Sequence, residues 1–363
     1  MNHFAKHTYL FFILFITAGA GLLYINSQST HMSSPDFTPT LTESQAKADI
    51  ELAEASRDRK QKDIRILFLG DMMFDRSIRD VIGKKSVSHI FSDFDASLAS
   101  TDLNVANLEG PVAERQSVSV GSTQDQPQHF TFVFDPKIVA ALKERKFLVN
   151  LGNNHIMNFG ADGFQETKEN LEREKVPYFG EPDENNSYIA DLGGLQVGFA
   201  GYNRFVSADS KQTCANIVEL KKKTDLVVVY THWGQEYKKS PNESQIELAH
   251  AFIDAGANIV VGSHPHVIQP VEQYNGKYIF YSLGNFIFDQ YFSKATMQGL
   301  GVILNYNSNS KQLSFALLPH SIDKSGKLHT VEGKEKDELL HQLAESSSVG
   351  LQVKEDIKRG VIN

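Results

Sequence analysis

From residue 63 onward, short apolar runs alternate with longer segments in which apolar residues recur every three or four positions. The short runs predict buried strands. The clearest are residues 64–69, 195–202, 225–230, 258–261 and 277–282, and residues 103–107 and 147–151 fit less cleanly. The periodic segments predict helices over residues 88–100, 136–145, 161–175 and 243–255. This alternation predicts an α/β domain with helices covering the sheet faces.

Two late apolar runs, residues 299–306 and 312–318, predict a closing hairpin. We therefore expect one α/β domain over residues 63–320. Residues 321–363 are more polar and predict a peripheral C-terminal extension.

An uncharged run of 18 residues, 8–25, lies near the N-terminus. At about 1.5 Å per residue it would span roughly 27 Å, close to the apolar thickness of a bilayer. Lys6 precedes it and no Lys or Arg follows until Lys47, so we expect the N-terminus inside and the rest of the chain outside. A retained anchor over residues 1–26, in the cell membrane, is favoured. A signal peptide, cut near Ala18-Gly19-Ala20 to secrete the protein, is the alternative. Residues 27–62 predict a polar linker.

The composition narrows the classes of function. Hydrophobic residues are 41% and charged residues 22%, which excludes a wholly disordered or collagen-like chain. The net charge is −8, which argues against non-specific binding of nucleic acid. Cys214 is the one cysteine of the chain, so no disulfide forms within it.

Polar side chains follow five of the expected strands, where open α/β sheets place their ligands. The strand ends read Gly70-Asp71, Asn107-Leu108-Glu109, Asn153-Asn154-His155, Thr231-His232 and Gly262-Ser263-His264-Pro265-His266. Carboxylate, amide oxygen and imidazole are donors that suit Mn, Fe, Zn or Mg. A pair of such ions can stabilise the transition state of an in-line displacement. A histidine that is not bound to metal can protonate the leaving group. The sequence therefore predicts a site for one or two divalent ions.

Six motifs, spread over residues 66–289, resemble the capsule-synthesis CapA family, whose best-known members belong to bacterial poly-γ-glutamate capsule systems. They are GDMMFDR (70–76), ANLEGPV (106–112), NNHIMNFG (153–160), HWGQEY (232–237), GSHPHVIQPVE (262–272) and YSLGNFIFDQ (281–290). The family in turn is similar to the calcineurin-like metallophosphoesterases. That resemblance implies a four-layer αββα sandwich with a two-metal site, here preceded by the N-terminal transmembrane helix.

The resemblance also implies roles for individual residues. Asp71, Glu109, Asn154, His232, His264 and His266 match metal ligands, and His155 matches the catalytic histidine that protonates the leaving group. Glu109 stands where the superfamily has a bridging Asp. Met73 departs from the superfamily motif, because a histidine is expected at that position and a thioether is a poor ligand for a hard ion. Asp75 would either compensate as a ligand or cap a helix.

Three further motif residues are candidates for contacts with substrate or with the ligands. Arg76 would hold an anion, or lie on a solvated helix face. Glu236 would support His232 or act as a base, or form a surface ion pair. Asn285 would bind substrate or fix a turn.

The resemblance implies an accessory role in assembly of an exported acidic polymer, beside a membrane-bound capsule polymer synthase. The strand-end residues favour an alternative, a metal-dependent phosphoesterase or other hydrolase outside the membrane. A structural domain with a relict site is the third reading. The expected partners are the membrane, the synthase complex and an anionic polymer, but no nucleic acid.

Overall fold

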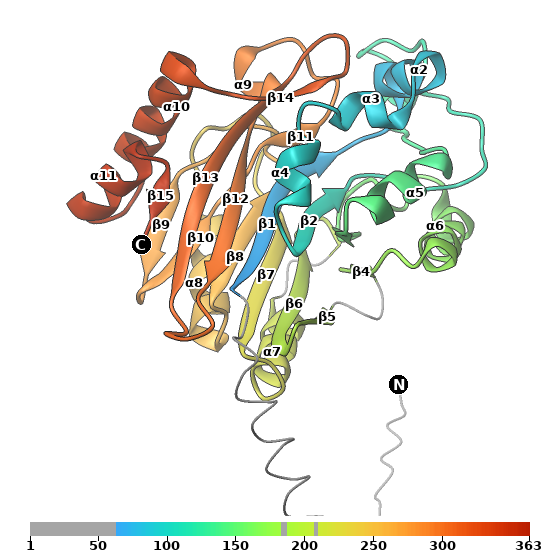
Figure 1. Cartoon of the computed structure of the whole chain (residues 1–363). Helices are drawn as coiled ribbons and strands as arrows, with labels where there is room; N and C mark the ends of the chain where they lie inside the picture. The colour runs from blue at the N-terminus through green and yellow to red at the C-terminus, as the bar shows by residue number, and fades with distance from the viewer. Residues whose placement is uncertain (1–62, 183–186, 207–209) are drawn as a thin grey trace, which may run out of the picture. The chain divides into compact units, whose positions relative to one another are not determined.

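The computed structural model of the chain describes residues 63–182, 187–206 and 210–363. These residues form a mixed α/β fold with two sheets (Figure 1). The predicted anchor and linker, residues 1–62, lie outside this part of the chain. Among the described residues, no helix combines the length and the apolar character needed to cross a membrane.

The larger sheet is built around β1. Strands β1 (Ile64–Met72), β2 (Leu103–Leu108), β3 (Phe147–Asn150) and β4 (Tyr178–Phe179) run parallel. On the other side of β1, an antiparallel meander follows: β12 (Gln298–Tyr306), β13 (Leu313–Ile322) and β14 (Leu328–Thr330). Short strand β11 (Asn285–Ile287) pairs with the end of β1, and β15 (Val361–Ile362) pairs with β13. The meander contains the predicted hairpin.

The smaller sheet has a parallel centre with antiparallel edges. Its order is β5 (Ser187–Leu192), β6 (Leu195–Asn203), β7 (Leu226–His232), β8 (Ile259–Ser263), β10 (Lys277–Phe280) and β9 (Val271–Tyr274). β6, β7, β8 and β10 run parallel. Both sheets thus have a parallel portion whose carboxyl ends are available for ligand binding.

The helices connect the strands and flank both sheets. Before β6 they are α2 (Arg76–Lys84), α3 (Val87–Phe91), α4 (Asp95–Ala99), the 3-10 turn Pro127–Phe130, α5 (Lys137–Glu144) and α6 (Gly160–Glu174). After β6 they are α7 (Lys211–Lys221), α8 (Glu243–Ala255), α9 (Lys294–Met297), α10 (Gly333–Ser346) and α11 (Leu351–Lys358).

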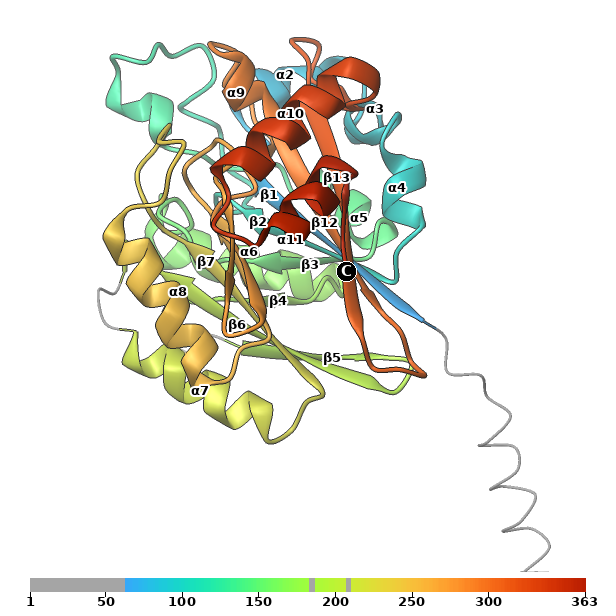
Figure 2. The same cartoon turned by 90° about the vertical axis from the view of Figure 1, so that its left-hand side faces the viewer.

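The period-two alternation of β1 explains how the layers stack. Ile66 and Phe68 point into a core shared with the smaller sheet, where Tyr230 of β7 lies. Leu67 and Leu69 point to the opposite face, into a core shared with α3 to α6. The outer face of the smaller sheet packs against α7 and α8 through residues such as Val229. The order is therefore helices, larger sheet, smaller sheet, helices (Figure 2).

Residues 321–363 lie at the meander edge of the larger sheet. α10 and α11 contribute Leu340, Leu343 and Ile357 to the core between the sheets, and β15 adds Ile362. The segment expected as a peripheral extension thus contributes buried side chains to the same compact unit as the strands.

The helices differ from the predicted ones in two respects: one is divided, and others were not predicted. The helix expected over residues 88–100 is divided into α3 and α4 by a turn at 92–94, where Ser92 and Asp93 favour turn geometry. Helices α7, α10 and α11 were not predicted, because their apolar residues are sparse.

Candidate metal centre

The carboxyl ends of strands from both sheets meet at one place. Asp71 lies on β1, Glu109 directly follows β2, and His232 ends β7. The loop after β8 supplies His264 and His266. All five residues are buried.

Two glycines allow the strand ends to come this close. A Cβ at Gly70 would lie 1.8 Å from the carbonyl oxygen of Gly284, and one at Gly262 would lie 2.0 Å from that of Tyr281. Only glycine therefore fits immediately before Asp71 and in the approach to His264. His264 and His266 themselves adopt φ values of 92° and 57°, in the left-handed region that costs a non-glycine residue backbone energy.

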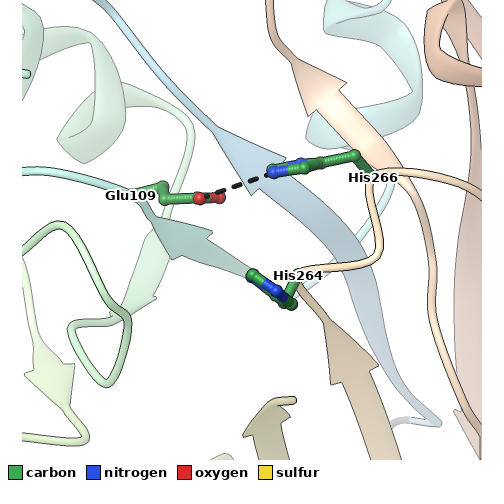
Figure 3. Close-up of side chains that lie close together, drawn as sticks. All are labelled: Glu109, His264 and His266. Atoms are coloured by element: carbon green, nitrogen blue, oxygen red, sulfur yellow. Dashed lines mark ion pairs between the residues drawn. The ribbon is translucent and has the colours of Figure 1, made fainter. Parts of the chain in front are cut away.

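Oε1 of Glu109 is the centre of the cluster. It lies 3.8 Å from Nε2 of His266, 4.0 Å from Nε2 of His232 and 3.9 Å from Nε2 of His155. Figure 3 shows Glu109 pointing at His266, with His264 beside them. This oxygen is buried and has no hydrogen-bond partner among the described residues. Burying a carboxylate oxygen without a hydrogen-bond partner costs free energy of folding. A cation bound beside this oxygen would offset that cost.

The hydrogen bonds of the imidazoles fix which nitrogen of each ring faces Glu109. Nδ1 of His232 lies 3.0 Å from the Ser263 hydroxyl, which donates its own hydrogen to the carbonyl oxygen of Thr231. With the proton on Nδ1, His232 donates to Ser263 and Nε2 keeps the lone pair that a metal ligand needs; the opposite tautomer would pair Nδ1 with the Asn107 amide at 3.3 Å and Nε2 with Asn154 Oδ1 at 2.8 Å. Two other atoms that can bind a cation, Asn154 Oδ1 and His264 Nδ1, lie within 3.2 Å of this Nε2.

His266 and His155 are fixed in the same way. Nδ1 of His266 lies 2.9 Å from Oδ1 of Asn285, and Nδ1 of His155 lies 3.2 Å from Oδ1 of Asn158. Asn285 donates its amide to the Thr296 carbonyl, and Asn158 Oδ1 also accepts the Phe132 N–H, so both oxygens face the rings. Each ring therefore turns an unprotonated Nε2 toward Glu109.

Burial and mutual charge set the protonation of the cluster. Burial and the nearby Asp71 raise the pKa of Glu109 well above its ordinary value. Burial alone would raise the pKa of Asp71, but hydrogen bonds from His266 and Asn107 favour the carboxylate, and the pKa of Asp71 is lowered. Burial and His264 lower the pKa of His232, and burial and His266 lower the pKa of His264 to about 3. His232 and His264 are thus neutral, as histidines that bind a metal must be.

The donors fit a divalent ion. Two groups have ligand atoms within 4.8 Å of one another: Glu109 with His264 and His266, and Asp71 with Glu109 and His232. Glu109 belongs to both groups, which is the placement of a carboxylate that bridges two ions. The partnerless Glu109 oxygen and the unprotonated nitrogens around it are the observations that support this fit.

Asn107, on β2, was not singled out by the sequence as a functional residue. Its amide donates to Oδ1 of Asp71 at 2.8 Å and lies 3.4 Å from Oε2 of Glu109. Its own oxygen accepts from the amides of Asn150 and Asn153 at 3.1 Å. Asn107 thus sets the spacing of the two carboxylates. Asn107 lies two residues before Glu109, and alternate residues of a strand share a face. This spacing could have indicated from the sequence that Asn107 lies beside the site.

His155 belongs to neither ligand group but faces the same centre. Burial lowers its pKa to about 4, so the ring is neutral and Nε2 accepts protons. Phe132 packs against the ring, with centroids 4.4 Å apart. The expected role as proton donor therefore requires His155 to gain a proton when a ligand binds.

The structure settles the two readings of Asp75. Its Oδ1 accepts the Arg76 N–H at the start of α2, and its Oδ2 accepts from Ser119 and from the Val133 N–H. It caps the helix and is absent from both ligand groups. Met73 is buried, with its sulfur accepting the Asp75 N–H at 3.0 Å.

Arg76 does not lie on a solvated face, because only 7% of it is exposed. Its guanidinium pairs with Asp289 and lies between the rings of Phe132 and Phe288, at 5.0 and 5.4 Å. Those two rings also pack against His155 and His266.

The last two sequence candidates, Asn285 and Glu236, differ in their contacts. Asn285 orients His266 and donates to Gln290 at 3.1 Å, while Gln290 donates to the Tyr237 hydroxyl at 3.3 Å. Asn285 is therefore a positioning residue. Glu236 is exposed, and its charge helps to raise the pKa of Glu109.

Exposed aromatic side chains border the centre. Phe205 packs on His264 with centroids 4.3 Å apart, and Tyr237 packs on Phe292 at 5.3 Å and faces His266 at 6.1 Å. These rings are 42–55% exposed. Large exposed aromatics beside a polar centre are typical of a binding surface.

Comparison with known proteins supports this assignment of motifs. The model of the family described as "Bacterial capsule synthesis protein PGA_cap" matches residues 65–290. The "PGA biosynthesis protein CapA" of Bacillus subtilis (strain 168) is 37% identical over 246 residues, covering 61% of this chain and 63% of that protein. The chain thus matches less than two thirds of this relative's length.

Two further relatives extend the comparison. The "Capsule biosynthesis protein CapA" of Bacillus anthracis is 28% identical over 81% of this chain and 76% of its own. The "Probable polyglutamine synthesis accessory protein Rv0574c" of Mycobacterium tuberculosis (strain ATCC 25618 / H37Rv) is 24% identical over 52% of this chain and 56% of its own. The crystal structure of Chaetomium thermophilum Vps29 is 11% identical with a TM-score of 0.32, covering 74% of this chain and 91% of that one. That likeness is too distant to place the fold.

The matched region contains all five buried residues of the centre, from Asp71 to His266. The family model covers well over half of the chain. The chain belongs to the bacterial capsule synthesis protein family.

Proposed function

We propose that this chain is an accessory protein of capsule biosynthesis whose α/β domain contains a divalent metal centre. Family membership and the names of the Bacillus and Mycobacterium relatives support the accessory role, with a poly-γ-glutamate-like polymer as the product. The partners would be the polymer and a synthase complex in the membrane. The uncharged run over residues 8–25 supports an extracytoplasmic domain held by a single span.

One observation supports the metal centre above all others. Glu109 Oε1 is buried without a hydrogen-bond partner, and three unprotonated imidazole nitrogens lie 3.8–4.0 Å from it. Four acceptors facing one another repel unless a cation lies between them. Asp71, Glu109, Asn154, His232, His264 and His266 would hold one or two ions. Bound Mn, Fe, Zn or Mg would supply Lewis-acid stabilisation of developing negative charge and activation of water.

The second candidate function is a metal-dependent hydrolase, of phosphoesterase type or acting on the polymer. His155 favours it, because an imidazole that faces the centre without belonging to a ligand group is placed to move a proton. Asn158 accepts a hydrogen bond from Nδ1 of this ring, on the side away from Glu109, and Phe132 packs against the ring face. The stacking of helices, two sheets and helices also supports a metallophosphoesterase-like arrangement.

The first experiment is elemental analysis of the full chain in detergent, with His264→Ala beside the wild type. We expect one or two ions per chain, reduced in the variant. No bound metal when Mn, Zn and Fe are each offered would refute the metal centre. Deletion of the gene would then test the accessory role: undiminished surface polymer contradicts it. For the hydrolase, activity unchanged by His155→Ala would exclude the proton transfer assigned to this ring.

A further inference from the structure

A cleft of about 350 Å³ lies between α9 and α10, outside the metal centre. Figures 1 and 2 both place these helices side by side at the same end of the molecule. This volume falls within the usual range of ligand sites. The residues of the metal centre do not line it.

One wall of the cleft continues the chain segment that carries His264 and His266. Val267 and Ile268 line it and directly follow His266, so their Cα atoms lie within about 8 Å of that of His266. Tyr237 faces His266 and contacts Phe292, and each of these two aromatic residues precedes a lysine of the cleft wall by two residues. A chain molecule bound in the cleft would therefore reach the centre past two exposed aromatic rings.

The lining combines three kinds of chemistry. Leu339, Leu343 and Ile268 are apolar, and Gln298 and Gln342 offer amides. Lys239 and Lys294 bring positive charge, against a single lining carboxylate, Glu338. Lys294 pairs with Glu335 at 3.0 Å, an exposed pair of little energetic worth. For Lys239 the structure gives no ion pair with any described residue.

A buried amide network holds the lysine-bearing loop in place. Gln269, which is buried, donates to the backbone oxygens of Lys238 and Ser240 at 2.8 and 3.2 Å. Gln245 of α8 in turn donates to Gln269 at 2.9 Å. The Tyr237 N–H is bonded to the Pro265 oxygen at 2.8 Å, which ties the same loop to the segment bearing the metal ligands. Hydrogen bonds on both sides of Lys239 thus hold its backbone in place relative to the centre.

We propose that this cleft binds a segment of an acidic, γ-linked glutamate polymer and leads it to the metal centre. Each repeat of such a polymer has two methylenes, one amide and one carboxylate, which match the apolar, amide and cationic parts of the lining. The overall charge of −8 opposes general capture of polyanions, so the two lysines must act locally. The proposal rests on the proposed function for the identity of the polymer.

The test uses the full chain in detergent and a fluorescent γ-linked glutamate decamer, with binding followed by anisotropy. The K239E/K294E double variant reverses both lysines of the cleft, and Ser346→Trp fills it without changing charge. The matched control is K222E/K223E, two exposed lysines at the end of α7. We expect each cleft variant to weaken binding by about tenfold or more and the control by less than twofold. Metal content should be unchanged in all of them.

Two results would overturn the proposal. Equal decamer binding by the wild type, K239E/K294E and S346W would exclude the cleft while leaving polymer recognition intact. An absence of decamer binding by the wild type would refute polymer binding at the cleft, and capsule yield in the deletion strain would then decide separately whether the proposed function survives.

Discussion

Replacing Glu109 with glutamine is the sharpest test of the metal centre, because it separates stability from function. Oε1 of Glu109 is buried without a partner, and neighbouring Asp71 adds negative charge. In a protein without metal, this carboxyl destabilises the fold. Glutamine has nearly the same shape, but its amide can donate a hydrogen bond to the acceptors around it.

The size of the effect follows from the burial. Leaving a buried acceptor unpaired costs about 1–3 kcal/mol, so Glu109→Gln should stabilise the metal-free protein by an amount in that range. For a domain of this size each kcal/mol corresponds to about 2–4 °C in Tm. With metal at 100 times its Kd the wild type should gain about 2.7 kcal/mol, and the variant much less.

The pH dependence has a definite sign. Because the pKa of Glu109 is raised by folding, the native state binds more protons than the unfolded state, and metal-free stability falls as pH rises from about 4.5 through the raised value. Glu109→Gln removes this loss. Its advantage over the wild type in chelator should therefore be greater at pH 8 than at pH 5.

Thermal unfolding with EDTA and with excess Mn²⁺ or Zn²⁺, at both pH values, measures these differences. Asp80→Asn, at an exposed carboxylate of α2, serves as the control for removing one charge. A lower Tm for Glu109→Gln in EDTA would refute the reasoning, since it would mean that the carboxylate stabilises the fold without any metal.

Three other substitutions test the contacts around the centre. Gly70→Ala places a Cβ 1.8 Å from the Gly284 oxygen and should cost about 3 kcal/mol or more in chemical denaturation. Gly83→Ala in exposed α2, where nothing lies within 4 Å, should be neutral or stabilising; equal effects would contradict the close approach. Asn107→Leu removes the donor shared by the two carboxylates and should weaken metal binding by about 10–100-fold in a chelator competition. Unaltered affinity would show that Asn107 does not position them. His320 is buried, and burial lowers its pKa to about 4, so the wild type should lose about 2 kcal/mol between pH 7 and pH 5 as the unfolded state takes up the proton. His320→Gln should lose correspondingly less over the same interval, and identical pH profiles would exclude this histidine as the source.

Much of the fold was predictable from the sequence because strand burial has a local signature. β1, β6 and β7 are continuous apolar runs, since each is covered on both faces. Helices α7 and α10 were missed because each has only three buried residues among many polar ones. α10 belongs to the core through contacts with strands far away in the chain, which no local period encodes.

The sequence by itself determined the candidate ligands, because parallel strands bring their carboxyl ends to a common edge. It could not determine how the side chains at those ends pair. That Ser119 and Val133 occupy the second oxygen of Asp75, that Arg76 is buried between two phenylalanines, and that Asn285 orients His266 depends on segments up to about 200 residues apart. Tertiary structure also decided the protonation of the centre, because burial and hydrogen-bond partners determine which nitrogen of each imidazole faces Glu109.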